Sequence, residues 1–202
     1  MTGTGTRIAR TIAAAAALAG LAAIAACETP APASKLPELT FSHLPTLRIP
    51  VQRIEVVNRY VAPMREPNVE HLFPVPPARA MERWAADRLK ADGGRGVARF
   101  SIAEASVKET KLPRDTSTRG YFTKQQSERY DARVDATLEI QDAVGAMKGV
   151  ANAHATRSVS VREDASLNER ERTKFDLVEG LMKDFDAEIE RSILRYLATL
   201  PR

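Results

Sequence analysis

The segment YDARVDATLEIQ, residues 130–141, alternates strictly between apolar and polar side chains. Its apolar members are Tyr130, Ala132, Val134, Ala136, Leu138 and Ile140, and its polar members are Asp131, Arg133, Asp135, Thr137, Glu139 and Gln141. Successive side chains of a strand point to opposite faces of its sheet, so this alternation predicts a strand with one buried and one solvated face. The sheet that contains this strand is therefore expected to be covered on one side and open on the other.

Three further segments are predicted strands. Residues 150–161 alternate in the same way and follow residues 130–141 after a short turn, so the two strands should pair antiparallel and bury a single side. Residues 97–110 change parity after Ile102, which predicts a bulge near residues 103–105. The first strand, around residues 47–57, contains Pro50, which cannot donate a ladder hydrogen bond and belongs at an edge or a bulge.

Two segments have the periodicity of amphipathic helices. Residues 77–91 repeat apolar side chains every three or four positions, and Trp84 is the expected core anchor of that face. The last segment begins with a capping box, Ser166 and Glu169. Its apolar stripe consists of Phe175, Val178, Met182, Phe185, Ile189, Ile193 and Leu197. It predicts one long helix, with Gly180 as a candidate point of bending.

The order strand, helix, three strands, helix defines the expected architecture. Strands and helices that are segregated in this way are typical of an α+β fold. We expect a four-stranded, mostly antiparallel sheet with two helices on one face. The small alanines of residues 150–161 should allow a helix to approach that face closely.

The first 26 residues have the order of a secretory signal. Arg7 and Arg10 precede an apolar, alanine-rich run from Ile12 to Ala26, which leads directly to Cys27. This run is shorter than the roughly 20 residues that a bilayer-spanning helix needs. Residues 1–26 are therefore predicted to be a cleaved signal peptide.

Cys27 is the only cysteine of the chain. A single thiol closes no intramolecular disulfide and forms no Cys-x-x-Cys metal site, and a nucleophilic role would need a base beside it. Ile24-Ala25-Ala26-Cys27 resembles the bacterial lipobox, whose cysteine receives diacylglycerol before the signal is cut off and the new amino group is acylated. This resemblance implies that Cys27 is lipidated and that its acyl chains anchor the protein to a membrane.

The lipobox divides the chain into three parts. Residues 27–45 form the lipidated N-terminus and a tether, because their prolines favour an extended segment. Residues 46–202 form a single α+β periplasmic domain with a long C-terminal helix. The net charge of +4 falls by two once the signal, with its two arginines and no acid, is removed. This small remaining charge gives no support for nucleic-acid binding.

The sequence lacks the patterns that identify enzymes and cofactor sites. It contains no His-x-x-x-His, His-Glu-x-x-His or Gly-x-Ser-x-Gly motif, and residues 93–96 lack the Lys-Ser/Thr of a phosphate loop. His43, His71 and His154 fall in a linker, a loop and a strand. We therefore predict no catalytic residue, metal ligand or cofactor. The alternative, a periplasmic hydrolase, would need a pocket that brings a histidine to a carboxylate and a nucleophile.

Two surfaces are candidates for binding a partner protein or a lipid headgroup. One is the polar sheet face around Arg133, Asp135 and His154, for which a solvated, self-compensating surface is the other interpretation. The second lies at residues 70–77, within the proline-rich segment 62–77 that we expect to be an ordered, irregular loop. Its candidate residues are His71, Leu72, Phe73 and Val75. The alternative for Leu72 and Phe73 is that they cap the open end of the core.

The order of elements also resembles a class of envelope proteins. A lipobox, a proline-rich tether and strand, helix, three strands, helix, with PPARAMERWAADRLKADGG before a strand, is similar to accessory lipoproteins of Gram-negative envelope transport. These are the ABC-transport auxiliary lipoproteins of the paraquat-inducible protein C type and the LptE-like lipopolysaccharide-assembly lipoproteins. The resemblance implies a non-catalytic domain that binds a membrane-spanning or periplasm-spanning envelope protein.

The lipobox resemblance also bears on location. In enteric bacteria, aspartate after the cysteine retains a lipoprotein in the inner membrane, so Glu28 favours the inner leaflet of the outer membrane, with the inner membrane as the alternative. The first functional hypothesis is a non-enzymatic accessory lipoprotein of envelope transport or assembly. The second is a cell-wall-associated regulatory or structural lipoprotein, which should co-sediment with peptidoglycan.

Overall fold

The structure is a computed structural model that describes residues 36–113 and 125–197. The candidate lipidation site Cys27 and the signal segment 1–26 lie outside these residues.

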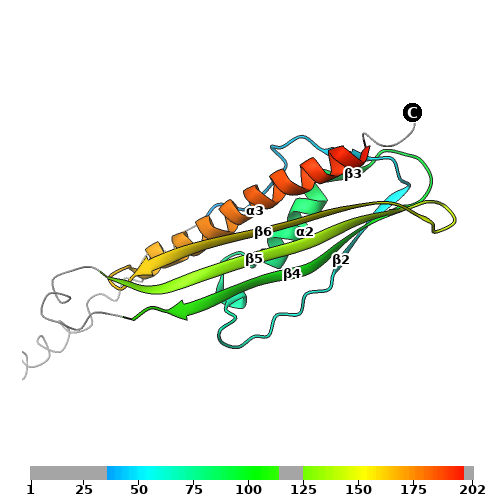
Figure 1. Ribbon diagram of the computed structural model, residues 1–202. Coiled ribbons are helices and arrows are strands. Elements are labelled where there is room, and N and C mark those ends of the chain that lie inside the picture. Colours follow the sequence, from blue (N-terminus) through cyan, green and yellow to red (C-terminus); the bar gives the residue numbers. More distant parts are fainter. Residues whose placement is uncertain (1–35, 114–124, 198–202) are drawn as a thin grey trace, which may run out of the picture. The chain divides into compact units, whose positions relative to one another are not determined.

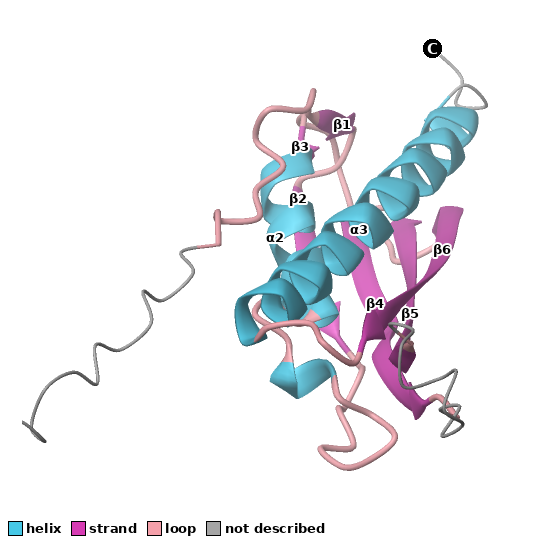
Figure 2. Cartoon of the chain, turned by 90° about the vertical axis from the view of Figure 1, so that its left-hand side faces the viewer, coloured by secondary structure: helices cyan, strands magenta, loops and turns pink. Residues whose placement is uncertain are grey.

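The main sheet contains four strands in the order β2-β4-β5-β6 (Figure 1). The strands are β2 (Arg53–Asn58), β4 (Val97–Lys111), β5 (Gln126–Gln141) and β6 (Met147–Arg162). The β4–β5 and β5–β6 pairs are antiparallel, and β2 pairs with β4 in parallel. The helices α2 (Pro77–Arg88) and α3 (Leu167–Leu197) cover one face of this sheet (Figure 2). The predicted α+β fold, a mostly antiparallel four-stranded sheet with two helices on one face, is confirmed.

The alternation of residues 130–141 has the predicted effect. The six apolar side chains of this part of β5 are buried, and its polar side chains point to the uncovered face. The bulge expected near residues 103–105 is also present, because the β4–β5 register shifts between Ile102 and Glu104. It returns Ala105 and Val107 to the buried face after Phe100 and Ile102. One bulge thus keeps a strand of 15 residues amphipathic along its length.

The first predicted strand differs from the structure. Residues 47–57 form two separate strands, because Pro50 interrupts them: β1 (Leu47–Ile49) pairs in parallel with β3 (Leu89–Ala91), and only β2 joins the main sheet. The helix predicted over residues 77–91 accordingly ends at Arg88. Leu89 is buried beside Leu47, so pairing with β1 replaces the last helical turn.

Helix α3 begins as its sequence predicts. The backbone N–H of Ser166 donates to Oε2 of Glu169 at 2.8 Å, and the N–H of Glu169 donates to Oγ of Ser166 at 3.3 Å. This capping box lowers the pKa of Glu169, chiefly through the bond from the Ser166 backbone. The helix runs without interruption through Gly180, the candidate point of bending. A Cβ at Gly180 would lie 2.5 Å from Nε of Arg157.

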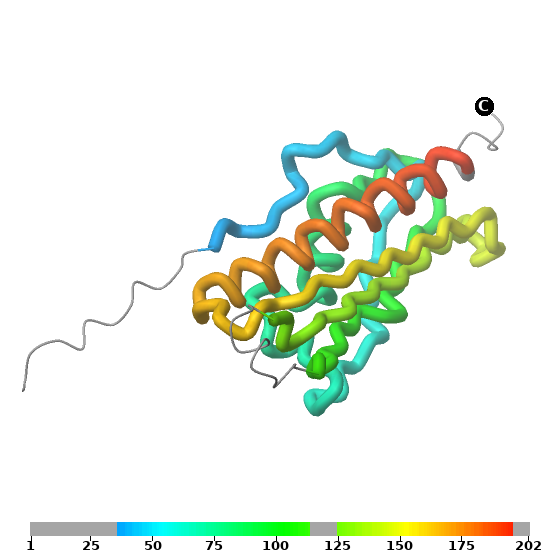
Figure 3. Tube along the Cα trace, turned by 60° about the vertical axis from the view of Figure 1, so that its left-hand side comes forward, coloured from blue at the N-terminus to red at the C-terminus, as the bar shows by residue number. Residues whose placement is uncertain are grey.

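Residues 36–45, the end of the segment predicted as tether, run beside α3 (Figure 3). Leu39 and Phe41 are buried in the core of the domain, and the N–H of Phe41 donates to Oδ2 of Asp87 at 2.8 Å. This part of the tether segment therefore packs with the domain from Leu36 onward.

The two helices are joined by a buried polar cluster. Arg88, only 1% exposed, donates from Nε to Oδ1 of Asp186 and from Nη2 to Oε2 of Glu190, both at 2.9 Å. The indole N–H of Trp84 donates to the same Asp186 oxygen at 2.7 Å. The ring of Trp84 also packs edge-to-face on Phe185 with centroids 5.3 Å apart. Trp84 is thus the core anchor that its position predicts, and its polar atom fixes α2 to α3.

Replacing Asp186 by alanine should remove the shared acceptor of this cluster. Arg88 and Trp84 would then each keep a buried donor without that acceptor, so the free energy of unfolding should fall by about 3 kcal/mol or more. Urea denaturation of residues 36–202 measures this loss.

Asp184→Ala is the matched control for Asp186→Ala. Asp184 also lies on α3 and pairs with Arg157 at 2.8 Å, but both side chains of this pair are about half exposed. The loss expected from an exposed pair is about 1 kcal/mol or less. Equal losses in the two variants would contradict the role given to the buried cluster.

Candidate functional site

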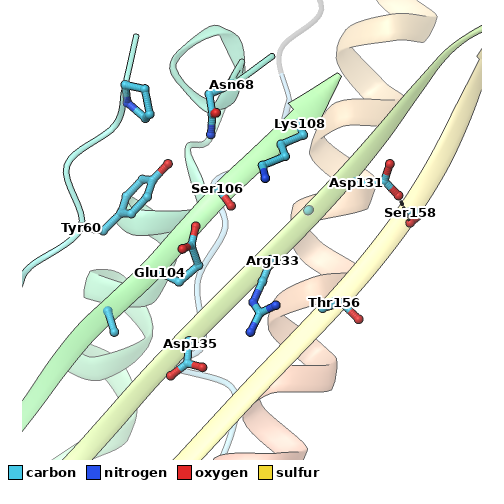
Figure 4. A pocket seen from close by; sticks show the side chains of 13 residues that line it. Tyr60, Asn68, Glu104, Ser106, Lys108, Asp131, Arg133, Asp135, Thr156 and Ser158 are labelled. Atoms are coloured by element: carbon cyan, nitrogen blue, oxygen red, sulfur yellow. Dashed lines mark hydrogen bonds between the residues drawn. The ribbon is translucent and has the colours of Figure 1, made fainter. Parts of the chain in front are cut away.

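The uncovered face of the main sheet is hollowed into a groove of about 860 Å³ (Figure 4). Its floor is formed by β4, β5 and β6, and one wall is formed by the loop of residues 59–69. The lining side chains are Tyr60, Pro63, Asn68, Ala103, Glu104, Ser106, Lys108, Asp131, Ala132, Arg133, Asp135, Thr156 and Ser158. We refer to this feature as the sheet groove.

Strand register arranges the floor of the sheet groove in three rows. Lys108, Asp131 and Ser158 are neighbours across β4, β5 and β6. The next row contains Ser106, Arg133 and Thr156. The third contains Glu104, Asp135 and His154. Because directly opposite side chains lie about 5 Å apart at their Cβ atoms, each row is a unit that one ligand group could contact.

The loop that forms the wall is held by a buried carboxylate. Glu70, only 3% exposed, lies in the short helix η2 (Glu70–Leu72) and accepts a hydrogen bond from the hydroxyl of Tyr60 at 2.6 Å. Its other oxygen accepts from the N–H of Val107 at 3.2 Å. Burial, and then the bond to Glu70, raises the pKa of Tyr60, so this hydroxyl remains a donor well above neutral pH.

Backbone bonds hold the same loop against β4. The N–H of Val69 donates to the carbonyl of Val107 at 2.9 Å, and the N–H of Glu109 donates to the carbonyl of Pro67 at 2.8 Å. This short stretch extends the edge of β4 beyond the end of β2. The wall of the sheet groove is therefore fixed at both ends of its loop.

The charges of the sheet groove differ in how far they are compensated. Asp131 accepts from the hydroxyl of Ser158 and from Arg129 at 2.7 Å, and these bonds lower the pKa of Asp131. Among residues 36–113 and 125–197, Glu104, Lys108, Arg133 and Asp135 form no ion pair. Glu104 and Asp135 are also direct neighbours across two strands. The sheet groove thus offers unpaired groups of both signs.

The predicted polar surface lies at this site. Arg133 and Asp135 line the sheet groove, and His154, which is exposed, lies opposite Asp135 on β6 just outside the lining. Sequence reasoning missed Tyr60, Asn68, Glu104 and Lys108. The alternation of side chains within β4 could have placed Glu104 and Lys108 on the polar face. No local sequence pattern, however, predicts that the loop of residues 59–69 lies beside this face.

The four candidate residues of the predicted loop surface at residues 70–77 differ in burial. Phe73 is buried and meets Tyr130 edge-to-face with ring centroids 5.5 Å apart, and Val75 packs partly buried against the core. Leu72 is exposed. His71 is half-buried, and its Nδ1 is buried without a hydrogen-bond partner among the described residues. None of the four residues lines the sheet groove.

No group of three or more His, Cys, Asp or Glu side chains among residues 36–113 and 125–197 could hold a metal ion. Within the same residues, no helix combines the length and apolar character required to cross a bilayer.

Replacing Glu70 by glutamine should loosen the wall of the sheet groove. The amide is the same size but offers one neutral acceptor oxygen where the carboxylate offers two, so the free energy of unfolding should fall by about 1–3 kcal/mol. Urea denaturation of residues 36–202 measures the change. Glu104→Gln, which alters a carboxylate without an ion pair in the described structure, is the control and should change it by about 0.5 kcal/mol or less.

The chain matches no protein-family model and no curated protein sequence. Several solved structures resemble it weakly. A protein described as a lipoprotein from Caulobacter crescentus CB15 has a TM-score of 0.38 and 14% identity, covering 73% of this chain and 92% of its own. Rare lipoprotein B from Shewanella oneidensis has a TM-score of 0.34 and 11% identity, with coverages of 73% and 94%. A minor lipoprotein from Acinetobacter baumannii has a TM-score of 0.37 and 15% identity, with coverages of 74% and 93%. We assign neither fold nor function from similarities at this level.

Proposed function

We propose that the mature chain is a lipid-anchored, periplasm-facing lipoprotein that acts without catalysis, as an accessory component of envelope transport or assembly. Cys27 carries the anchor and the inner leaflet of the outer membrane is the target, as the lipobox and Glu28 indicate. The sheet groove binds the partner, which is an envelope protein or a lipid. The observation that carries this proposal is the combination of a lipobox with a domain whose helices leave one sheet face uncovered and hollowed.

The chemistry of the sheet groove supports binding over catalysis. Its floor presents Lys108 and Arg133 beside Glu104 and Asp135, all on rigid strands, and it contains no histidine or cysteine. Because strands already fix the backbone of these residues, only their side chains lose conformational entropy when a ligand docks. Groups of both signs suit a polar partner whose own charges complement them, and such pairs favour specificity and fast association.

The anchor is tested by replacing Cys27 with serine in the full chain. Because the serine cannot receive the thioether-linked lipid, the variant should persist as a larger precursor that incorporates no labelled palmitate. Gel mobility and acyl labelling in a Gram-negative host measure both effects. On a density gradient of membranes, the unaltered protein should band with the outer membrane. Normal maturation of the serine variant would exclude the proposed anchor.

The binding surface is tested by reversing one charge of the sheet groove. Arg133→Glu should reduce the amount of partner recovered with the lipidated protein from detergent-solubilised membranes at least fivefold, because it places a carboxylate among Glu104, Asp131 and Asp135. Quantitative mass spectrometry of the eluates measures the ratio. Arg191→Glu, at an exposed position of α3, is the matched control and should leave recovery unchanged. Equal recovery in both variants would exclude the sheet groove as the binding surface.

A further inference from the structure

The chain enters the domain near the start of α3. Leu39 and Phe41 line a cavity of about 450 Å³ together with side chains of α3 between Asp176 and Asp186, around the middle of that helix. In Figure 3 the described part of the chain begins, at its blue end, beside the first turns of α3. We call this end of the domain, which carries the start of α3 and the end of β6, the entry end.

Both ends of the domain expose apolar side chains. At the entry end, Leu167 is 74% exposed as the first residue of α3. Leu72 is also exposed there, and its carbonyl accepts a hydrogen bond from Nζ of Lys174 at 3.3 Å. At the opposite end, Val144 in the β5–β6 turn is 88% exposed. Exposure alone therefore does not decide which end would meet a lipid surface.

The length of chain before Leu36 decides it. Cys27 and Leu36 are nine positions apart, and nine residues reach at most about 30 Å when fully extended. Strand β6 has 16 residues, which span about 50 Å between the entry end and the β5–β6 turn. A domain standing on its Val144 end would hold Leu36 farther from the bilayer than this chain can reach.

We infer that the entry end contacts the phospholipid bilayer that holds the Cys27 anchor, with Leu167 and Leu72 as its apolar contacts. This inference rests on the lipid anchor of the proposed function. Arg162 and Arg172, two arginines of this end, already pair with Asp164 at 3.3 Å and Asp176 at 2.9 Å. The contact therefore depends on apolar burial more than on net charge, and it should be insensitive to salt. In this orientation the strands of the main sheet extend away from the membrane surface, and the sheet groove faces the periplasm to the side of the domain.

Labels at the two ends of the lipidated full-length protein test this orientation. Leu167→Cys and Val144→Cys each introduce one free thiol, because the thiol of Cys27 is consumed by its lipid. Each variant is purified with its acyl chains, labelled with an environment-sensitive dye and reconstituted in vesicles of phosphatidylethanolamine and phosphatidylglycerol. Lipids with a spin-labelled acyl chain then quench a dye that reaches the bilayer. Both positions are exposed, so neither substitution should disturb folding.

The expected result is at least threefold stronger quenching at position 167 than at position 144, at both 50 mM and 500 mM salt. Equal quenching would show a domain lying flat, stronger quenching at 144 would show the opposite orientation, and no quenching would show a domain held off the surface. Each of these three results would overturn the inference. Mass spectrometry of the N-terminal peptide separates the two proposals, because a chain without acyl groups would contradict the proposed function itself.

Discussion

The structure depends on the buried contact of Arg88 and Trp84 with Asp186. One carboxylate oxygen accepts both donors of α2, and this fixes α2 and α3 together over the same face of the sheet. Because the cost of burying Arg88 is offset only while its acceptors are present, this side chain can stay buried only if α2 and α3 remain packed together. Their fixed position leaves the other sheet face uncovered along β4, β5 and β6. The sheet groove is thus accessible because both helices pack on the opposite face of the sheet.

A second buried polar group shapes the sheet groove itself. Glu70 binds the Tyr60 hydroxyl and the Val107 N–H, so it ties the loop of residues 59–69 to β4. Without this wall, the polar face would be a flat, solvated sheet surface. With it, Lys108, Arg133 and Asp135 line a concave site whose position is set by strands and by a fixed loop. The carboxylate of Asp186 therefore joins the two helices on the covered face, whereas that of Glu70 ties the loop to β4.

Local patterns predicted the local structure well. The period of two in residues 130–141, the parity change after Ile102 and the capping box at Ser166 each depend on neighbours in sequence, and each appears as expected. The parallel pairings β1–β3 and β2–β4 did not follow from such patterns, because each joins segments about 40 residues apart. Residues 89–91 likewise form strand β3 in place of one more helical turn because they pair with β1.

The candidate site was predicted in part, for the same reason. Arg133 and Asp135 belong to the polar face that the alternation of β5 defines, whereas Tyr60 and Asn68 reach the groove through a loop that a distant contact positions. Phe73 and Val75 looked available in sequence but pack in the structure, since apolar residues in an irregular loop also close the open end of a core. Burial of irregular segments depends on the tertiary arrangement that surrounds them.

The central claim is that the sheet groove is occupied when the lipidated protein is in its native membrane. Reaction of lysine side chains with an amine reagent, quantified by mass spectrometry in native membranes and again after purification, tests it most directly. Lys108 in the sheet groove should react at least threefold more slowly in membranes than after purification, while Lys183, exposed on α3, should react equally in both. Equal reactivity of Lys108 in the two preparations would contradict the account.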